Sequence, residues 1–288
     1  MRPCGWGLIG IAALGVWSCS GGTDRGEATL ERIRRAGVVR VGFANEAPYA
    51  YQDRATGQVT GEAPEIARVV FERMNVGRIE GVLTEFGALI PGLQAGRFDL
   101  IAAGMYITQP RCAQIAFSNP TYSIGEAFIV EAGNPLGLHS YEDVRARSGA
   151  TLGVVSGAIE RNYARAVGIS DDRIMTFPDP PSAMAAVRAS RVSAFGATEL
   201  TVESLLNKDR DGLEKADPFE DPLIERERVR GYGAFGFREG DTMLLAEFNR
   251  QLGTFIGTPE HLKLVEPFGF GKPQLPGRMT AKELCGES

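Results

Sequence analysis

Residues 87–105, with the sequence GALIPGLQAGRFDLIAAGM, contain the pattern that decides the fold. The first half reads as a short helix that stops at Gly96, because glycine is common just after the end of a helix. The second half is an apolar run that reads as a buried strand. A helix that leads into a strand through a glycine is a building unit of α/β proteins.

The same alternation extends on both sides of this stretch. The expected elements before it are a helix over 29–37, a strand over 38–44, a helix over 63–76 and a strand over 79–86. The pattern restarts near Thr151, with strands over 150–157, 172–179 and 193–198 and helices over 158–168 and 180–192. Strands that alternate with helices form largely parallel sheets, so the sequence predicts two α/β lobes.

Two stretches are expected to connect the lobes. Residues 126–137 (EAFIVEAGNPLG) form an apolar strand and turn, and the segment 213–241 is charged and then rich in glycine and aromatic residues. We expect lobe 1 to comprise residues 29–127 and 232–288, and lobe 2 to comprise residues 128–231. Two lobes joined by two crossover strands leave a cleft between them, where a ligand would meet the carboxyl ends of the strands.

The N-terminal residues indicate export. An apolar run from Gly5 to Trp17 is short for a membrane-spanning helix, and small residues follow it. We expect a signal peptide over 1–18 and a polar, flexible tether over 19–28. The residues around Cys19 resemble a bacterial lipobox, so Cys19 is the expected lipidation site of an extracytoplasmic protein. Ordinary cleavage into a soluble secreted form is the alternative.

Cysteine and charge content narrow the possible functions. Beyond Cys19, the exported chain would hold only Cys112 and Cys285, which favours a disulfide in an oxidising compartment; two free thiols are the alternative. The net charge of -5, without a long basic block, does not support nucleic-acid binding. His139 and His261 each stand apart from other metal-ligating residues, so no metal and no cofactor is expected.

Aromatic and ionisable residues follow four of the expected strands. They are Glu46 and Tyr49, then Phe86, then Tyr106 and Arg111, and finally Glu160. The rings would contact a flat or cationic body, and Arg111 would bind a carboxylate through paired hydrogen bonds. The two glutamates would take the positive end. The predicted ligand is therefore a small zwitterion with a delocalised cation.

Each candidate also has an ordinary structural explanation. The three aromatic side chains could belong to the core. Glu160 could be an acid favoured at a helix N-terminus by the helix dipole, and Arg111 could pair with a local carboxylate. Their shared placement directly after strands favours a binding site over these separate explanations.

Two long stretches resemble a known family. Residues 30–51 (LERIRRAGVVRVGFANEAPYAY) and 85–120 (EFGALIPGLQAGRFDLIAAGMYITQPRCAQIAFSNP) resemble the amino-acid-type substrate-binding proteins of bacterial ABC transporters. The resemblance is closest to the branch that binds ectoine and hydroxyectoine, and it runs from about Thr29 to the C-terminus. It implies a type II periplasmic-binding-protein fold whose two lobes close on the ligand by hinge motion. It also implies a monomer that delivers its ligand to a membrane permease.

The resemblance assigns roles by position. Arg111 matches the carboxylate-binding arginine, Glu46 an acid that contacts the ring nitrogens, and Glu160 an acid of the second lobe. The rings of Tyr49, Phe86 and Tyr106 match an aromatic cage, although that branch has phenylalanine at the first and third positions and tyrosine at the second. Ile159 stands where the branch has a hydroxylated residue. Cys112 and Cys285 match two cysteines of the branch, which supports the disulfide.

The expected function is a binding protein, without catalysis, for ectoine or hydroxyectoine. A binding protein for a polar amino acid is the alternative within the same class. A distant alternative is an enzyme, because the same fold supports a periplasmic cyclohexadienyl dehydratase. That reaction needs a general acid, for which Glu46 or Glu160 could serve.

Overall fold

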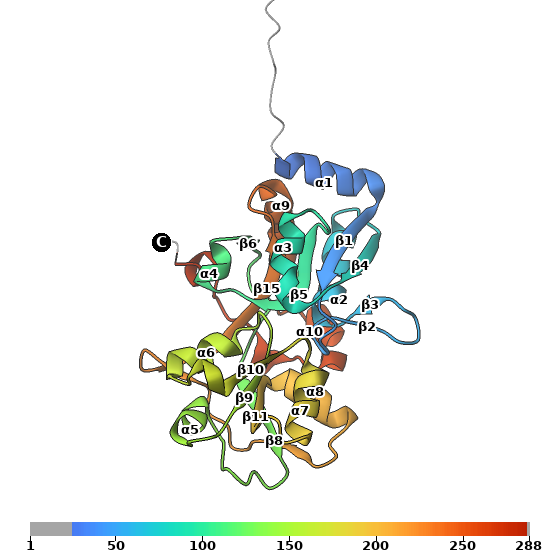
Figure 1. The fold of residues 1–288 in the computed structure, drawn as a ribbon. Helices are drawn as coiled ribbons and strands as arrows, with labels where there is room; N and C mark the ends of the chain where they lie inside the picture. The colour runs from blue at the N-terminus through green and yellow to red at the C-terminus, as the bar shows by residue number, and fades with distance from the viewer. Residues whose placement is uncertain (1–24, 287–288) are drawn as a thin grey trace, which may run out of the picture.

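The structure, a computed structural model, describes residues 25–286 and shows two α/β lobes, one above the other in Figure 1. The predicted signal peptide and Cys19 lie outside the described residues. Within residues 25–286, no helix is long and apolar enough to cross a membrane.

Each lobe is built on one sheet. The upper sheet in Figure 1 runs in the order β4 (Arg78–Leu83), β1 (Val38–Phe43), β5 (Leu100–Tyr106), β15 (Gly231–Phe237) and β6 (Ala116–Phe117), with β7 (Tyr122–Ile124) also paired to β15. The lower sheet runs in the order β10 (Ile174–Phe177), β9 (Leu152–Val155), β11 (Ala194–Thr198), β8 (Glu126–Glu131) and β12 (Leu213–Lys215). Two small ladders join β2 (Tyr51–Gln52) to β3 (Val59–Thr60), and β13 (Leu223–Ile224) to β14 (Glu227–Arg228).

Helices surround both sheets. The upper lobe has α1 (Arg25–Ala36), α2 (Glu62–Arg73), α3 (Leu89–Gln94), α4 (Gln109–Cys112), α9 (Thr242–Gly253), α10 (Pro259–Val265) and α11 (Ala281–Leu284). The lower lobe has α5 (Tyr141–Ala146), α6 (Glu160–Val167), α7 (Pro180–Arg188) and α8 (Glu199–Lys208). Short 3-10 turns lie at η1 (Phe86–Ala88), η2 (Asp171–Arg173), η3 (Glu266–Phe268) and η4 (Lys272–Gln274).

The decisive stretch folds as predicted. Helix α3 is followed by Gly96, whose φ of 71° is the left-handed conformation that glycine adopts readily, and β5 follows. The ring of Phe98 lies where side chains on Gly42 and Gly92 would otherwise stand, since a Cβ there would come within 2.5 and 2.8 Å of that ring. These two glycines let Phe98 pack α3 closely against β1.

The sheets are less parallel than the sequence suggests. Strand β1 pairs in parallel with β4 and β5, and β9 with β10 and β11, as expected from strands alternating with helices. The crossover strands differ: β8 is antiparallel to β11, and β15 is antiparallel to β5. They enter their sheets from the other lobe rather than through a helix of the same lobe, so the right-handed parallel connection does not apply to them.

The polypeptide passes between the lobes twice, and each connection is only a few residues long. Only Gly125 separates β7 of the upper sheet from β8 of the lower sheet, and β15 returns shortly after β14. The carboxylate of Asp221 accepts a hydrogen bond from the backbone N–H of Glu126 at 2.7 Å, and a side chain on Gly125 would collide with it. The two crossover segments are therefore held to each other.

Helix α1 begins at Arg25, so residues 25–28 are helical and differ from the flexible tether predicted over 19–28. The reason is packing: Leu30 and Ile33 are buried, and α1 lies against α9. The Thr29 hydroxyl also donates a hydrogen bond to Asp241 at 2.8 Å.

A disulfide joins Cys112 at the end of α4 to Cys285 just after α11, so the predicted pairing is present and the two thiols are not free. The Cα atoms are 5.8 Å apart, and the C-terminus lies beside α4 in Figure 1.

Candidate functional site

Arg111 stands where the two lobes meet. One of its terminal nitrogens, Nη1, donates to the carbonyl of Tyr106 in the upper lobe at 2.8 Å. The other, Nη2, donates to the carbonyl of Gly157 in the lower lobe at 3.0 Å. The guanidinium carbon lies 5.5 Å from the ring centre of Phe86. Within the described residues, these contacts use two of the five N–H groups of the guanidinium and include no salt bridge, so the local ion pair considered above does not form.

Glu160 faces Arg111 from the first position of α6. It is 5% exposed, and its Oε2 has no hydrogen-bond partner in the described part of the chain. Burial raises the pKa of Glu160 to about 8; the nearby Glu46 adds to this rise, while its own backbone N–H and Arg111 oppose it. Glu160 is thus both a helix N-terminal acid and a member of the interlobe cluster. This name is used for the ionisable and hydroxyl side chains that surround Arg111, Glu160 and Glu46 at the lobe boundary.

A chain of hydroxyl groups links Tyr49 to Glu46 through the lower lobe. The Tyr49 hydroxyl donates to Thr198 at 2.8 Å, Thr198 donates to Thr201 at 3.0 Å, and Thr201 donates to Glu46 at 2.7 Å. Burial raises the pKa of Glu46, and the Thr201 bond opposes this rise. Two of these hydrogen bonds, from Tyr49 to Thr198 and from Thr201 to Glu46, cross the lobe boundary. The series therefore holds the two lobes together.

Two glycines lie where the backbones of the two lobes approach each other closely. A Cβ on Gly157, whose φ is +79°, would lie 2.5 Å from the Cα of Gly87. Apolar packing continues across the same boundary, since Ile159 and Leu200 of the lower lobe belong to the core cluster of the upper lobe. Residues of both lobes therefore pack directly against each other at this boundary.

The three predicted aromatic residues do not form one face. Tyr49 and Tyr106 are almost fully buried and flank Tyr122, with ring centres 5.3 and 6.4 Å away from it. Phe86 lies in a different cluster, beside Arg111. The Tyr49 ring packs on Tyr122 and its hydroxyl bonds to Thr198, so Tyr49 is explained as a core residue. The hydroxyl of Tyr106, in contrast, has no partner among the described residues.

Glycines make room for these rings. A Cβ on Gly231 would lie 1.8 Å from the ring of Tyr106, and one on Gly104 would lie 2.5 Å from the ring of Tyr49. Glycines of both β5 and β15 therefore let the tyrosine rings pack closely against the sheet.

The sequence reasoning missed several members of the cluster. They are Glu126, Tyr141 and Tyr163, which surround the acids, and Thr198 and Thr201, which form the hydroxyl chain. One signal was present: Glu126 is an acid at the start of an apolar crossover strand, where a charge is expensive to bury unless it has a role. Nothing in the sequence marked the two threonines, because their upper-lobe partners, Tyr49 and Glu46, are over 140 residues away.

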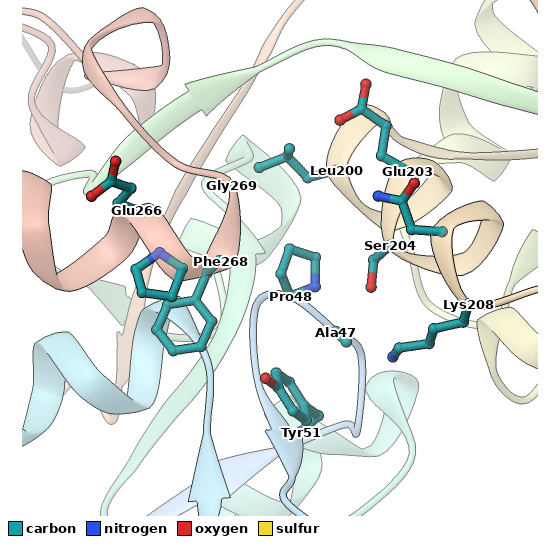
Figure 2. Close-up of a pocket in the computed structure, with 12 residues that line it drawn as sticks. Ala47, Pro48, Tyr51, Leu200, Glu203, Ser204, Lys208, Glu266, Phe268 and Gly269 are labelled. Atoms are coloured by element: carbon teal, nitrogen blue, oxygen red, sulfur yellow. The ribbon is translucent and has the colours of Figure 1, made fainter.

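Two open pockets border this cluster. Figure 2 shows the first, of about 460 Å³, between the loop containing Ala47, Pro48 and Tyr51 and the α8 residues Leu200 and Lys208. The second, of about 550 Å³, shares Ala47, Tyr51 and Lys208 and is also lined by Glu46. Neither is lined by Arg111 or Glu160, so both lie at the outer edge of the interlobe boundary.

No group of three or more His, Cys, Asp or Glu side chains in residues 25–286 is arranged to hold a metal ion. The acids of the cluster instead face hydrogen-bond donors and an arginine.

Comparison with known proteins places this arrangement in a family. The model of the bacterial extracellular solute-binding proteins, family 3, matches residues 39–272. A probable amino-acid ABC transporter periplasmic-binding protein of Sinorhizobium fredii is 38% identical over 265 residues, which cover 90% of this chain and 87% of the relative. The lysine/arginine/ornithine-binding periplasmic protein of Escherichia coli is 27% identical over 222 residues, covering 75% and 81%.

Solved structures agree. The crystal structure of EhuB in complex with hydroxyectoine superposes with a TM-score of 0.82 at 33% identity, covering 91% of this chain and 99% of that one. The ancestral amino acid-binding protein AncCDT-1, a precursor of cyclohexadienyl dehydratase, gives a TM-score of 0.71 at 25% identity, covering 83% and 99%.

The fold prediction is confirmed, and the curated relatives are binding proteins rather than enzymes. Their partners are a small amino-acid-like ligand and an ABC permease, and their place of action is outside the cytoplasm. The chain belongs to the bacterial extracellular solute-binding proteins of family 3, as an amino-acid-type binding component of an ABC transporter.

Proposed function

We propose that this protein binds ectoine or hydroxyectoine at the interlobe cluster and delivers it to an ABC permease. Both are compact zwitterions that carry a carboxylate and a delocalised cation. The likeness to EhuB in complex with hydroxyectoine supports this proposal.

The observation that carries the proposal is the position of Arg111. Its guanidinium lies 5.5 Å from the centre of the Phe86 ring, bonds to a carbonyl in each lobe, and lowers the pKa of Glu160 against the effect of burial. Three N–H groups remain for a ligand carboxylate, which guanidinium binds through paired charge-assisted bonds. Since burial lowers the pKa of Arg111 by disfavouring its charge, an anionic ligand group there would restore favourable electrostatics.

The positive end of the ligand would face the acids. Glu160 offers an oxygen without a hydrogen-bond partner in the described residues, and Glu46 lies near enough to raise its pKa. Two acids around one cationic group favour a charge spread over more than one nitrogen. The buried hydroxyl of Tyr106, which has no hydrogen-bond partner in the described residues, adds a further donor or acceptor.

Calorimetric titration of the mature protein tests the proposal. The ligands are ectoine, hydroxyectoine, glycine betaine, proline, glutamine and arginine. We expect binding of ectoine or hydroxyectoine and none of glycine betaine, which lacks N–H donors for the two acids. Binding restricted to a standard amino acid would refute the ectoine assignment and leave the amino-acid alternative.

Two further proposals concern the N-terminus and the boundaries of the lobes. We propose that Cys19 is lipidated after removal of residues 1–18, which intact-mass measurement of the protein from a bacterial host would test. We also propose that the lobes divide near Glu126 and Gly231, where the chain passes between the sheets. Limited proteolysis without ligand should first cut at the exposed Glu227 and Arg228, just before the second connection.

A further inference from the structure

Glu126 is a buried acid that the function described so far does not use. It is the first residue of β8, directly after the crossover at Gly125, and it is 5% exposed. Its Oε2 accepts a long hydrogen bond of 3.4 Å from the Tyr141 hydroxyl. Its Oε1 has no partner among the described residues. An acid in this setting is costly to the folded protein unless something else meets it.

The surroundings of Glu126 place it in the interlobe cluster. Burial raises its pKa strongly, and Glu160, Asp221 and Glu46 raise it further. The charge of Glu126 in turn raises the pKa of Tyr49 and of Tyr106 in the upper lobe. The residue is thus within electrostatic reach of both the hydroxyl chain and the Arg111 side of the site.

The pairing of β8 with β11 also places Glu126 beside the hydroxyl chain. Glu126 is paired with Thr198 across β8 and β11, and Thr198 is the first lower-lobe link in the chain from Tyr49 to Glu46. Glu126 therefore begins its strand at the same edge of the sheet from which Thr198 reaches the upper lobe.

Two carboxylate oxygens of the cluster are left for a ligand. Glu126 and Glu160 each have an oxygen without a partner in the described part of the chain, and Arg111 is the nearby cation. A neutral apolar ligand would leave both oxygens unpaired, whereas a cation with several N–H groups would satisfy them.

We propose that Glu126 is a third ligand-binding carboxylate, which accepts an N–H of a delocalised amidinium or guanidinium cation on the ligand. The inference rests on the proposed function for the location of the site and extends it to the choice of ligand. A third acid extends recognition to cations with more donors, such as a guanidinium.

The test compares Glu126→Gln with Glu131→Gln, a matched control at the exposed far end of the same strand. The ligands titrated are ectoine, hydroxyectoine, arginine and citrulline, which resembles arginine but carries an uncharged urea. We expect Glu126→Gln to weaken binding of the preferred cation at least tenfold, without lowering the ligand-free melting temperature, and Glu131→Gln to change neither. If arginine binds, its preference over citrulline should fall in the same variant.

The outcomes separate the two ideas. Binding by Glu126→Gln within twofold of wild type would overturn the role of Glu126. Should that variant fail to fold, Glu126→Asp, which keeps the charge on a shorter side chain, should still weaken binding at least threefold, and an unchanged affinity would overturn the proposal. A wild type that prefers arginine to ectoine refutes the proposed function, while the loss in Glu126→Gln still supports this inference. A wild type that binds none of the four ligands refutes both.

Discussion

Two buried glutamates, Glu62 and Glu160, occupy the same local position in different lobes. Each is the first residue of a helix, each is almost inaccessible to solvent, and each has one carboxylate oxygen without a partner in the described residues. Burial raises the pKa of both to about 8.

Their surroundings differ. Glu62 accepts a hydrogen bond from Thr121 at 2.8 Å within the upper lobe, beside the buried and apolar side of Tyr122. Glu160 faces Arg111 and Glu46 across the lobe boundary. Burial and helix position are therefore not enough to identify a ligand-binding acid; the distinguishing feature is a charged partner from the other lobe.

The largest expected effect follows from removing that partner. Arg111→Ala should weaken ligand binding by about 2–5 kcal/mol, because the ligand carboxylate and Glu160 both lose their cation. Glu62→Gln should leave affinity within twofold of wild type. Both are measured by calorimetry, with the exposed Arg210→Ala as control. Equal losses in Arg111→Ala and Glu62→Gln would remove the distinction between the two acids.

The second prediction concerns pH and stability. The folded-state pKa of Glu62 is about 8, above its ordinary value of 4.5, so the folded protein binds more protons than the unfolded chain between these values. Stability from this group is complete below about pH 4.5 and falls as pH rises to about 8. Glu62→Gln should remove this decrease in the free energy of unfolding, which amounts to about 3 kcal/mol between acidic pH and pH 7.

Ligand should separate the two acids in the same experiment, which is denaturant unfolding between pH 5 and pH 8. Without ligand, Glu160→Gln should flatten the profile as Glu62→Gln does. With saturating ligand, the bound cation lowers the pKa of Glu160, so only Glu62→Gln should still have this effect. A profile that Glu62→Gln leaves unchanged would show that Glu62 is not protonated in the folded state.

The third prediction tests closure of the lobes around Glu160. Gly157→Ala places a Cβ against Gly87 and forces alanine into a left-handed conformation, which costs about 1–2 kcal/mol. Gly149→Ala is the matched control, because its φ is +87° and no heavy atom lies within 4 Å of the added Cβ. Both variants should lose similar stability on thermal melting, and only Gly157→Ala should bind ligand more weakly, by about tenfold. Equal affinities would show that the lobes need not approach this closely.

The smallest effect concerns the hydroxyl chain. Tyr49→Phe removes the interlobe hydrogen bond to Thr198, and Tyr122→Phe removes a bond of equal length, 2.8 Å, to the carbonyl of Gly104 inside the upper lobe. Each should cost about 1 kcal/mol. Only Tyr49→Phe should enlarge the ligand-free radius of gyration in X-ray scattering, since only that bond resists opening. The same radius in both variants would contradict a role in closure.

The alternation of strand and helix was predictable because it is written in local apolar patterns and in glycines such as Gly96. Arg111 and Glu160 were predictable as neighbours because both follow strands that end at the lobe boundary. The bond from Tyr49 to Thr198 was not, because it depends on how the lobes close and joins residues 149 positions apart. Glu126 was overlooked for a related reason: its acid lies within an apolar strand pattern, and only the fold shows what surrounds it.

The disulfide also imposes an order of events on the newly made chain. Cys112 lies directly beside Arg111, yet its partner is Cys285, so the bond cannot form until 173 further positions of sequence have been made. Every strand of both sheets precedes residue 238. A chain cut before Cys285 would therefore contain both sheets and still lack the disulfide beside Arg111, so the support of this arginine is completed only after both sheets have been made.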